Sequence, residues 1–331
     1  MPLAAPFALV HEQRYAPLKI RLLDFLLRLR RGGVHYLVRY LAALRFKEIH
    51  SYQYRPKRAW LGFESEELEM IRTSEEDMDL KKIAESGQTF RAKEVSAGLY
   101  RFVCRESAIF ISRKGAGKFE VSCTPEEWEK IWIPYFDLDE SYKFDPKDFE
   151  NPYLKKAVEA GKGIRILRQD PWECLISFII SQRKNIPAIS SCVEKMSEER
   201  GKDIFTPSGI AKAFPRPEAL TKDLSGFKLG YREEYVKEAA QEVEEGKIDL
   251  KSLCSLPDAD LKAKLKEIRG VGEKIANCVS LFAYHRTACA PIDVWIEKII
   301  NNWFGGENPF PALGDKAGII QQYLYFYARS I

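Results

Sequence analysis

The stretch that decides the fold is residues 268–276, which read Ile-Arg-Gly-Val-Gly-Glu-Lys-Ile-Ala. Gly270 and Gly272 flank one small apolar residue between two segments of helical periodicity, so we predict a tight helix-turn-helix. Glycine lets the backbone of such a turn adopt conformations that a Cβ would forbid. The N–H groups at the start of the second helix can then donate to a phosphate oxygen. Gly270, Val271 and Gly272 are therefore candidate DNA-binding residues, of the kind that does not read base sequence.

Lys274 follows these glycines in the first turn of the second helix. Its place near the positive end of the helix dipole, together with partial burial, predicts that its ammonium form is disfavoured. A lysine that is neutral part of the time is a nucleophile. A solvated first-turn lysine is the simpler alternative, and a lone GVGxK motif does not decide between the two.

Asp293 lies further along the chain, in the loop Pro291-Ile292-Asp293 that precedes another apolar helical pattern. Its simplest role is to cap the N-terminus of that helix. An aspartate in this position can cap the helix and still direct its carboxylate toward Lys274. Lys274 and Asp293 are therefore the candidate catalytic pair.

The composition excludes several other kinds of site. Hydrophobic residues make up 45% and charged residues 30% of the 331 residues, which is ordinary for a soluble globular protein, and the net charge of +4 permits a polyanionic partner without demanding one. The seven cysteines include no CxxC pair, and three of the four histidines lie in the first fifty residues. Zinc sites, disulfide frameworks and histidine-based catalysis are therefore not expected. There is also no long apolar run or signal-peptide pattern, so we expect a protein that is soluble, not exported and not membrane-bound.

The chain divides into three segments by composition. Residues 1–50 carry nine Lys/Arg against three Asp/Glu. This basic extension is open to three interpretations: contact with nucleic acid or a membrane surface, a transit-like leader, or a loosely ordered end without a role of its own. Residues 51–160 hold short apolar runs at 98–104 and 108–112 that predict an antiparallel sheet. A Thr-Pro-Glu-Glu start at residue 124 predicts a helix in the same segment, which is therefore α+β.

Residues 161–331 are predicted to form an all-helical domain with short connections. Asp170-Pro171 starts its first helix, because Asp is a good N-cap and Pro suits the first helical position. Further helical patterns cover about residues 187–198, 232–245, 258–268, 273–285, 294–304 and 315–329.

With these residues in view, the chain resembles the helix-hairpin-helix (HhH-GPD) DNA glycosylases, and among them the 8-oxoguanine DNA glycosylase branch. The resemblance covers about residues 80–331. Besides the hairpin and the Pro291–Asp293 loop, it rests on residues 87–91 (GQTFR), 163–175 (GIRILRQDPWECL), 229–232 (LGYR) and 321–329 (QQYLYFYAR). It implies a sheet domain resembling half of the TATA-binding protein, then helical subdomains with a cleft between them.

The resemblance also implies a reaction on double-stranded DNA that contains an oxidised purine. The damaged base would be flipped out of the duplex. Lys274 would attack the sugar C1′, expel the base and form a Schiff base that leads to strand cleavage by β-elimination, an AP lyase activity. Asp293 would stabilise the positive charge that develops on the sugar.

Base recognition is carried over residue by residue. The backbone carbonyl of Gly87 would accept the N7 hydrogen that 8-oxoguanine has and guanine lacks. Cys278 and Tyr325 would sandwich the flipped base, and Gln321 would meet its Watson–Crick edge. For Cys278 and Tyr325, ordinary core packing is the alternative.

The chain departs from the branch on the side of the partner strand. An asparagine-rich run is replaced by Gln182-Arg183-Lys184-Asn185, and an arginine that some members aim at the orphaned cytosine is missing. Asn185 is retained as a DNA contact, and Arg183 and Lys184 either fill the gap, hold phosphates or form a solvated pair. Trp295 stands where other members carry a histidine contact. Preference for cytosine opposite the lesion is therefore open.

Two other functions remain possible on sequence alone. A sister glycosylase acting on oxidised pyrimidines, or on adenine opposite 8-oxoguanine, commonly carries a four-cysteine iron–sulfur loop, whereas this chain has no cysteine beyond Cys289. A non-catalytic DNA-binding module would not need both Lys274 and Asp293. We therefore expect a monomeric enzyme without an iron–sulfur cluster, and leave open a structural monovalent cation at the hairpin. It would be cytoplasmic and nucleoid-associated in a bacterium, and nuclear in a eukaryote.

Overall fold

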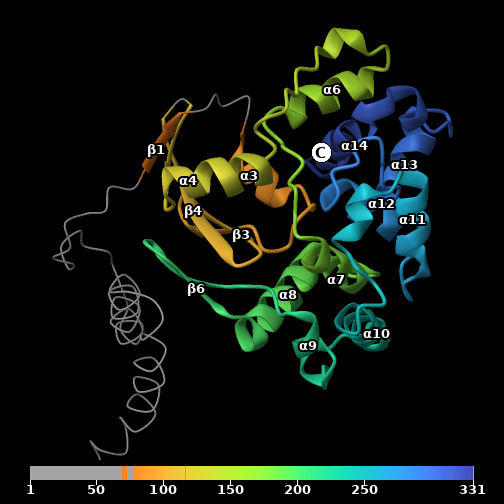
Figure 1. Cartoon of the computed structure of the whole chain (residues 1–331). Helices are drawn as coiled ribbons and strands as arrows, with labels where there is room; N and C mark the ends of the chain where they lie inside the picture. Colours follow the sequence, from red (N-terminus) through yellow and green to blue (C-terminus); the bar gives the residue numbers. More distant parts are fainter. Residues whose placement is uncertain (1–68, 73–77, 116, 331) are drawn as a thin grey trace, which may run out of the picture. The chain divides into compact units, whose positions relative to one another are not determined.

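The structure is a computed structural model that describes residues 69–72, 78–115 and 117–330. The basic extension expected at residues 1–50 lies outside the described residues. Figure 1 shows the described part as a twisted sheet with its own helices, followed by a larger group of helices. The fold class expected from the sequence, an antiparallel sheet followed by a helical part, is confirmed.

The sheet has five strands in the order β1-β5-β4-β3-β2, and every neighbouring pair is antiparallel. The central pair is in register from Leu99 opposite Ser112 to Cys104 opposite Ser107. The runs at 98–104 and 108–112 therefore form strands as predicted. The strands are β1 (Glu69–Arg72), β2 (Lys93–Ser96), β3 (Leu99–Cys104), β4 (Ser107–Gly115) and β5 (Lys118–Val121).

Successive side chains of the central strands point to opposite faces of the sheet, and each face is covered by other residues. On one face Phe102 and Ile109 pack against Trp132 and Phe136. These aromatic residues belong to the helical turns that follow the sheet. The turns are α4 (Pro125–Glu127), the π-helical η1 (Trp128–Trp132) and α5 (Ile133–Tyr135), and α3 (Leu80–Glu85) packs on the same core. The predicted start at Thr124 is confirmed as a complete capping box with Glu127.

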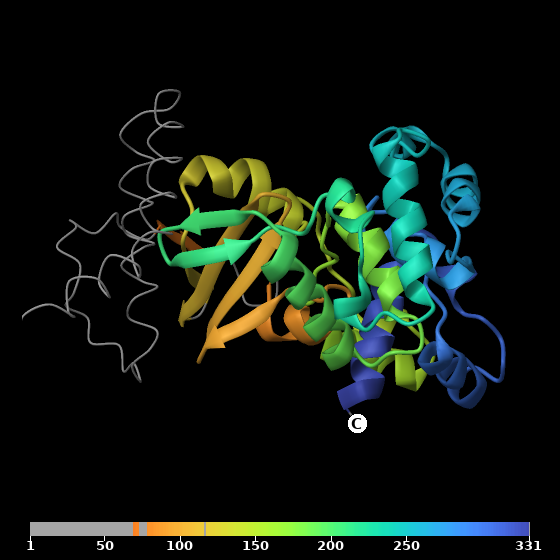
Figure 2. The same ribbon diagram turned by 90° about the horizontal axis from the view of Figure 1, so that it is seen from below.

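The other face explains one correction to the sequence prediction. A hairpin of β6 (Asp203–Thr206) and β7 (Gly209–Lys212) interrupts the half that we expected to be all-helical. Ile204 and Ala211 of the hairpin pack against Val103 and Ala108 of the sheet, and Figure 2 shows the hairpin lying beside these strands. Two four-residue strands are too short for their alternation to stand out, and they are stabilised by a sheet distant in sequence.

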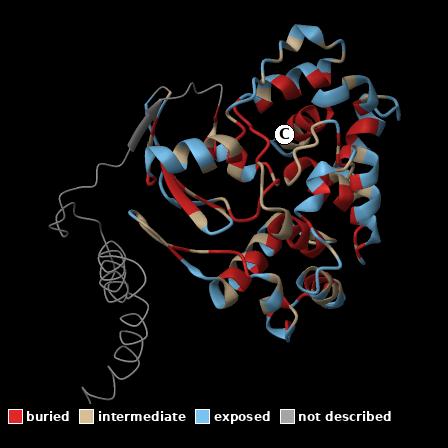
Figure 3. Cartoon of the chain, viewed as in Figure 1, coloured by how far each residue is buried: buried red, intermediate tan, exposed pale blue. Residues whose placement is uncertain are grey.

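The remaining helices agree with the predicted segments, and their buried sides face inward in Figure 3. They are α7 (Pro171–Ser181), α8 (Ile186–Arg200), α10 (Arg232–Glu244), α11 (Asp258–Glu267), α12 (Glu273–Phe282), α13 (Val294–Trp303) and α14 (Ala317–Ser330). The short helix α9 (Pro217–Leu220) was not predicted. Short 3₁₀ turns complete them: η2 (Pro146–Asp148), η3 (Ser225–Phe227), η4 (Ser252–Ser255) and η5 (Phe310–Lys316).

One longer helix, α6 (Pro152–Gly161), was also not predicted. Its Leu154 and Val158 belong to the same core as α7 and α12, and Gly161 lies against the ring of Tyr323 in α14. By packing, α6 therefore belongs to the core of the helical part. Leu167 still packs in the core of the sheet.

The chain between the sheet and α7 is held by buried polar side chains. Gln88 donates from Nε2 to the carbonyl of Arg165 at 2.8 Å and accepts from the N–H of Leu167 at 2.7 Å. Arg165 in turn donates to the carbonyls of Asp137 and Glu140. Because buried polar groups are costly when unpaired, these bonds fix the relative positions of residues 86–90 and the start of α7.

A buried ion pair lies at the start of α7. Glu173 Oε2 is 3.5 Å from Arg91 Nη1, and Arg91 also contacts Glu194 at 3.4 Å. Burial raises the pKa of Glu173 to about 7, although Arg91 opposes the shift. The folded protein therefore holds a proton on Glu173 over a pH range in which the unfolded chain has released it.

This shift predicts a pH dependence of stability. The free energy of unfolding should fall as the pH rises from about 4.5 to about 7, by a few kcal/mol at most, since about 1.4 kcal/mol corresponds to one pKa unit. Glu173→Gln should flatten that fall, because its amide does not titrate. Urea unfolding at pH 5 and pH 8 measures the difference. Glu198→Gln, on the exposed side of α8, is the matched control and should behave as the parent does. Equal pH dependence in Glu173→Gln and the parent would contradict the assignment.

Candidate active site

A cavity of about 670 Å³ opens between α7, α12, the start of α13 and α14. Its lining includes both predicted catalytic residues, all four predicted base-recognition residues and most of the predicted DNA contacts. These residues are Gly87, Arg183, Lys184, Asn185, Lys274, Cys278, Asp293, Trp295, Gln321 and Tyr325. The structure thus brings together residues from five separate segments of the chain.

The hairpin joins α11 to α12 beside this cavity without lining it. Gly270 has φ +87°, and a Cβ there would lie 2.5 Å from the ring of Tyr235, so this position requires glycine. Gly272 differs from our expectation: its φ is −93° and a Cβ would meet open space. As the N-cap of α12 it provides no side-chain hydrogen bond, which leaves the first N–H groups of the helix available to a ligand. Buried Val271 anchors the turn between them.

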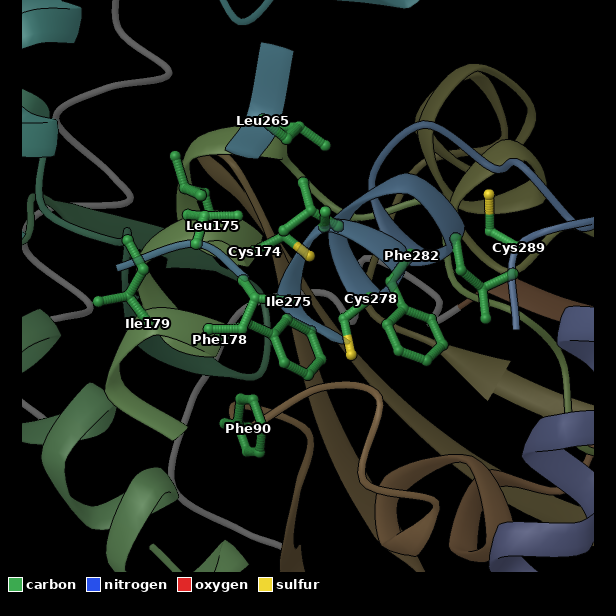
Figure 4. Packing of buried hydrophobic residues seen from close by; sticks show 14 of the residues in the cluster. Phe90, Cys174, Leu175, Phe178, Ile179, Leu265, Ile275, Cys278, Phe282 and Cys289 are labelled. Carbon is green, nitrogen blue, oxygen red and sulfur yellow. The ribbon is translucent and has the colours of Figure 1, made fainter. Parts of the chain in front are cut away.

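Lys274 is half-buried over an aromatic floor. Its Nζ lies 5.1 Å from the ring centroid of Phe178. That ring stacks on Phe282 at 5.6 Å and meets Phe90 edge-on at 5.4 Å, as can be followed in Figure 4. Ile275 and Cys278 of the same helix lie beside these rings. The amine is therefore presented from one face of α12 into a largely apolar space.

The charge state of Lys274 corrects a prediction. Burial alone lowers its pKa, as expected, but attraction by Cys278, Asp293 and Tyr325 outweighs burial and raises the pKa above its usual value. The ammonium form is therefore favoured before reaction. The dipole argument failed because it considered the α12 backbone alone, whereas Asp293 and Tyr325 lie in other segments and Cys278 lies one turn later.

Asp293 caps α13 as predicted. Its Oδ1 accepts hydrogen bonds from the N–H groups of Trp295 and Ile296, both at 3.0 Å. Both bonds use the same oxygen, so Oδ2 lies outside the cap. Because the cap fixes the carboxylate at the cavity wall, its charge acts on Lys274. The two roles considered for Asp293 are compatible.

Gly87 lies across the cavity from this pair. Its φ is +78°, and a Cβ would lie 3.1 Å from both Ile186 and Tyr325, so a larger residue would narrow the cavity and strain the backbone. The flanking residues are held firmly, since Gln322 Nε2 donates to the carbonyl of Ser86 at 2.5 Å. Among the described residues, the Gly87 carbonyl has no hydrogen-bond donor of its own.

Gln321, Cys278 and Tyr325 form the rest of the wall. Gln321 is 5% exposed, yet its Oε1 has no hydrogen-bond partner within the described part of the chain. An acceptor that is buried and unpaired is unusual and indicates a missing donor. Cys278 belongs to the main core and also lines the cavity. Tyr325 is half-buried at its edge and packs against the same core. Cys278 and Tyr325 therefore both pack against the core and line the cavity.

The rim carries the remaining predicted contacts. Arg183 is exposed and has φ +50°, an uncommon conformation for a residue with a Cβ. Asn185 accepts the N–H of Ala188 at 2.9 Å and caps α8, a role that we did not predict. Lys184 Nζ donates to the carbonyl of Lys228 at 3.4 Å. Trp295 is 50% exposed at the start of α13.

Sequence reasoning missed the functions of Phe178 and Gln182. Phe178 is one of several apolar residues of α7, and only its contact with Lys274 distinguishes it from the rest. Gln182 ends α7 and contacts the hairpin through Gly270, a residue distant in sequence. Neither contact leaves a signal in a single sequence.

Within the described ranges, no group of three or more His, Cys, Asp or Glu side chains is placed to hold a metal ion. None of the described helices is long and apolar enough to cross a bilayer.

Comparison with known proteins agrees with this geometry. Residues 70–175, from the first described strand into α7, match the family described as 8-oxoguanine DNA glycosylase, N-terminal domain. A probable N-glycosylase/DNA lyase from Methanothermobacter thermautotrophicus is 27% identical over 298 residues, which cover 76% of this chain and 94% of that protein.

Two solved structures cover most of the chain. One is MBOgg1 in complex with a low-affinity DNA ligand, at 33% identity and a TM-score of 0.73, covering 79% of this chain and 95% of that one. The other is the Clostridium acetobutylicum 8-oxoguanine glycosylase/lyase bound to double-stranded DNA with cytosine opposite 8-oxoguanine. It has 33% identity and a TM-score of 0.72, and covers 77% of this chain and 92% of that one. The chain therefore belongs to the helix-hairpin-helix DNA glycosylases, in their 8-oxoguanine DNA glycosylase branch.

Proposed function

We propose that this protein removes 8-oxoguanine from double-stranded DNA and then cleaves the strand at the resulting site, as a DNA glycosylase and AP lyase. One observation carries the proposal: Lys274 and Asp293 line the same cavity as Gly87, Cys278, Gln321 and Tyr325. The first pair supplies the chemistry and the other four supply a wall for a planar base. A binding module would need only the hairpin.

The reaction follows from the charge state of the pair. Lys274 enters as an ammonium, so it must lose a proton before its nitrogen attacks C1′. As the new C–N bond forms, the bond from C1′ to the base breaks, and the departing base anion takes up a proton. The ammonium group is a source of that proton. Asp293 stabilises the positive charge on the sugar meanwhile, in a cavity with an apolar floor that strengthens the attraction.

The lyase step uses the same covalent bond. The bond from C1′ to the ring oxygen O4′ first breaks, and O4′ takes up the proton that the Lys274 nitrogen loses, so the sugar opens and an imine joins Lys274 to C1′. The imine makes the 2′ hydrogen acidic, and loss of that proton breaks the bond from C3′ to the 3′ oxygen, which leaves with its phosphate. Water then releases the amine. We propose that no cofactor takes part in either step, and that any monovalent cation at the hairpin has a structural role.

Recognition of the lesion is proposed to depend on Gly87 and Gln321. The Gly87 carbonyl is rigidly held beside the cavity and accepts the N7 hydrogen of 8-oxoguanine, whereas guanine presents a lone pair there. The unpaired Oε1 of Gln321 accepts from the Watson–Crick edge of the flipped base. Both groups are acceptors that lack a donor, which supports their assignment to a ligand.

DNA is held without sequence reading by the open N–H groups of α12 and by the basic rim. We propose that the protein acts on the duplex as a monomer. A repair enzyme must reach chromosomal DNA, so it would act at the nucleoid of a bacterium or in the nucleus of a eukaryote.

Borohydride trapping tests the nucleophile. The parent should form a covalent complex with a duplex that contains 8-oxoguanine, because borohydride reduces the imine to a stable amine. Lys274→Gln should form none, and Lys251→Gln, which changes an exposed lysine, should trap normally. The products are separated on a denaturing gel. Normal trapping by Lys274→Gln would show that another amine reacts, and the absence of trapping with the parent would favour a non-catalytic DNA-binding protein.

Asp293→Asn removes the negative charge of this side chain but keeps its ability to cap α13. Asparagine caps helices as well as aspartate does, so the melting temperature should change little. The single-turnover rate of base release should nevertheless fall by about a hundredfold or more, since removing one electrostatic stabiliser typically costs about that much. A fall in rate that matched a loss of stability would reduce Asp293 to a structural cap.

The partner strand is expected to be read weakly. Arg232, the arginine of the Leu229–Arg232 segment, donates from Nε and Nη2 to the carbonyl of Gln182 and from Nη1 to that of Leu229. Arg183 is an exposed cation at the rim of the cavity. An arginine only donates, and every base presents at least one acceptor, so a single flexible guanidinium discriminates poorly.

We therefore expect excision rates opposite cytosine, adenine, guanine and thymine to lie within about tenfold of one another, since one well-placed pair is worth about 1–3 kcal/mol. Arg183→Asn should lower all four rates by a similar factor, and asparagine is chosen because it tolerates a positive φ. The measurement is single-turnover excision from four matched duplexes. A preference for cytosine above about a hundredfold would contradict this account.

A further inference from the structure

We propose that Gln182 is a positioning residue that couples the DNA-binding hairpin to the wall of the base cavity. The inference rests on the proposed function, since it assigns a part in that reaction to a residue outside the catalytic pair. Gln182 directly follows α7, and its side-chain Nε2 donates to the carbonyl of Gly270 at 3.1 Å and to that of Ile179 at 3.2 Å. The same residue lines the cavity.

The amide of Gln182 suits this place because it carries two hydrogens. One satisfies the carbonyl of Ile179, which lies in the last turn of α7 and has no partner within the helix. The other reaches across to the hairpin. A carboxylate of the same shape would turn an oxygen toward two carbonyl oxygens, and an apolar side chain would leave both without this donor.

The backbone of Gln182 is held from the opposite side. Its carbonyl accepts from Arg232 Nε at 2.8 Å and also from Arg232 Nη2. Arg232 is only 7% exposed and donates from Nη1 to the carbonyl of Leu229 at 3.0 Å, so it is fixed in turn. The position of Gln182 is therefore set by α10 as well as by α7.

These contacts close a ring around the hairpin. Arg232 stacks on Tyr231 at 4.4 Å, and Tyr231 meets the ring of Tyr235 at 5.8 Å. Tyr235 then lies so close to Gly270 that a Cβ there would clash. The carbonyl of Gly270 accepts the hydrogen bond from Gln182, which completes the ring of contacts. The hairpin is thus clamped between an aromatic ring and one amide hydrogen bond.

The clamp matters because the hairpin and the nucleophile belong to one rigid unit. Lys274 lies in the first turn of the helix that the hairpin begins, and the floor beneath its amine is Phe178 of α7. Gln182 therefore fixes the phosphate-binding end of α12 relative to α7. If a bound phosphate shifts the hairpin, the sugar and the amine go out of alignment, and small misplacements reduce rates steeply.

A merely structural role for Gln182 makes a different prediction. If Gln182 only stabilised the fold as a helix C-cap, its substitution would change the melting temperature. It would not lower the excision rate of the bound complex while leaving the affinity for DNA unchanged. A positioning role lowers the rate of the bound complex while the phosphate contacts at the hairpin persist. The two are separated by measuring excision at saturating enzyme and affinity for undamaged duplex on the same variants.

The test compares Gln182→Met with Gln241→Met as a matched control. Gln241 is exposed on α10 and lines no part of the cavity. Gln182→Met keeps the length and neutrality of the side chain but removes the donor. We expect about a tenfold loss in single-turnover excision of 8-oxoguanine, and affinity for undamaged duplex within twofold of the parent, since one hydrogen bond is involved. Gln182→Glu should lose more, and Gln241→Met should match the parent.

Hydrogen exchange of the backbone amides of Val271 and Ala276, which donate to the carbonyls of Ile268 and Gly272, supplies a readout that needs no substrate. We expect faster exchange in Gln182→Met and Gln182→Glu than in the parent and in Gln241→Met. Unchanged exchange, a parent-like excision rate in Gln182→Met, or an equal loss of rate and duplex affinity would each overturn the coupling. If the parent released no 8-oxoguanine, the proposed function would fail, and the exchange measurement would still decide whether Gln182 clamps the hairpin.

Discussion

The contact on which the site depends is the stacking of Phe178 on Phe282, which joins α7 to α12 beneath Lys274. Both helices are largely apolar where they meet, so their burial fixes the distance between them. A half-buried amine is stable there because its alkyl stem covers aromatic surface while its charge faces the cavity. Because α7 and α12 hold each other, the groups at their ends have fixed positions, Gln182 on one helix and the hairpin on the other.

The charge of Asp293 contributes to the electrostatic environment of Lys274 and of the cavity. Asp293 keeps one oxygen in the cap of α13, so it needs no second partner to stay in place. Its charge contributes to the raised pKa of Lys274, and in the proposed reaction the same charge would favour a cationic sugar. One carboxylate therefore favours a positive charge in this cavity, on the amine before reaction and, in the proposed reaction, on C1′. The apolar floor makes both effects stronger than they would be in water.

Local signals allowed most of the fold to be predicted. Thr124, Asp170 and Asp293 begin helices because their side chains accept backbone N–H groups, which depends on neighbouring residues alone. The hairpin β6–β7 was missed because its stability comes from the distant sheet. The charge state of Lys274 was predicted wrongly because groups in other segments determine it. The family resemblance supplied the identity of the cavity residues, whereas Gln182 has no local signal that would reveal its hydrogen bond to Gly270.

The loop that presents the Gly87 carbonyl is held by residues from opposite ends of the described chain. Gln88 binds the segment before α7, and the carbonyl of Ser86 is bound by Gln322 of the last helix. Such long-range contacts form late, because closing a long loop costs entropy before the contact can stabilise it. During synthesis, α7, the hairpin and Lys274 all emerge before α14 does. A ribosome-bound chain can thus assemble its nucleophile before it has a complete pocket with which to choose a base.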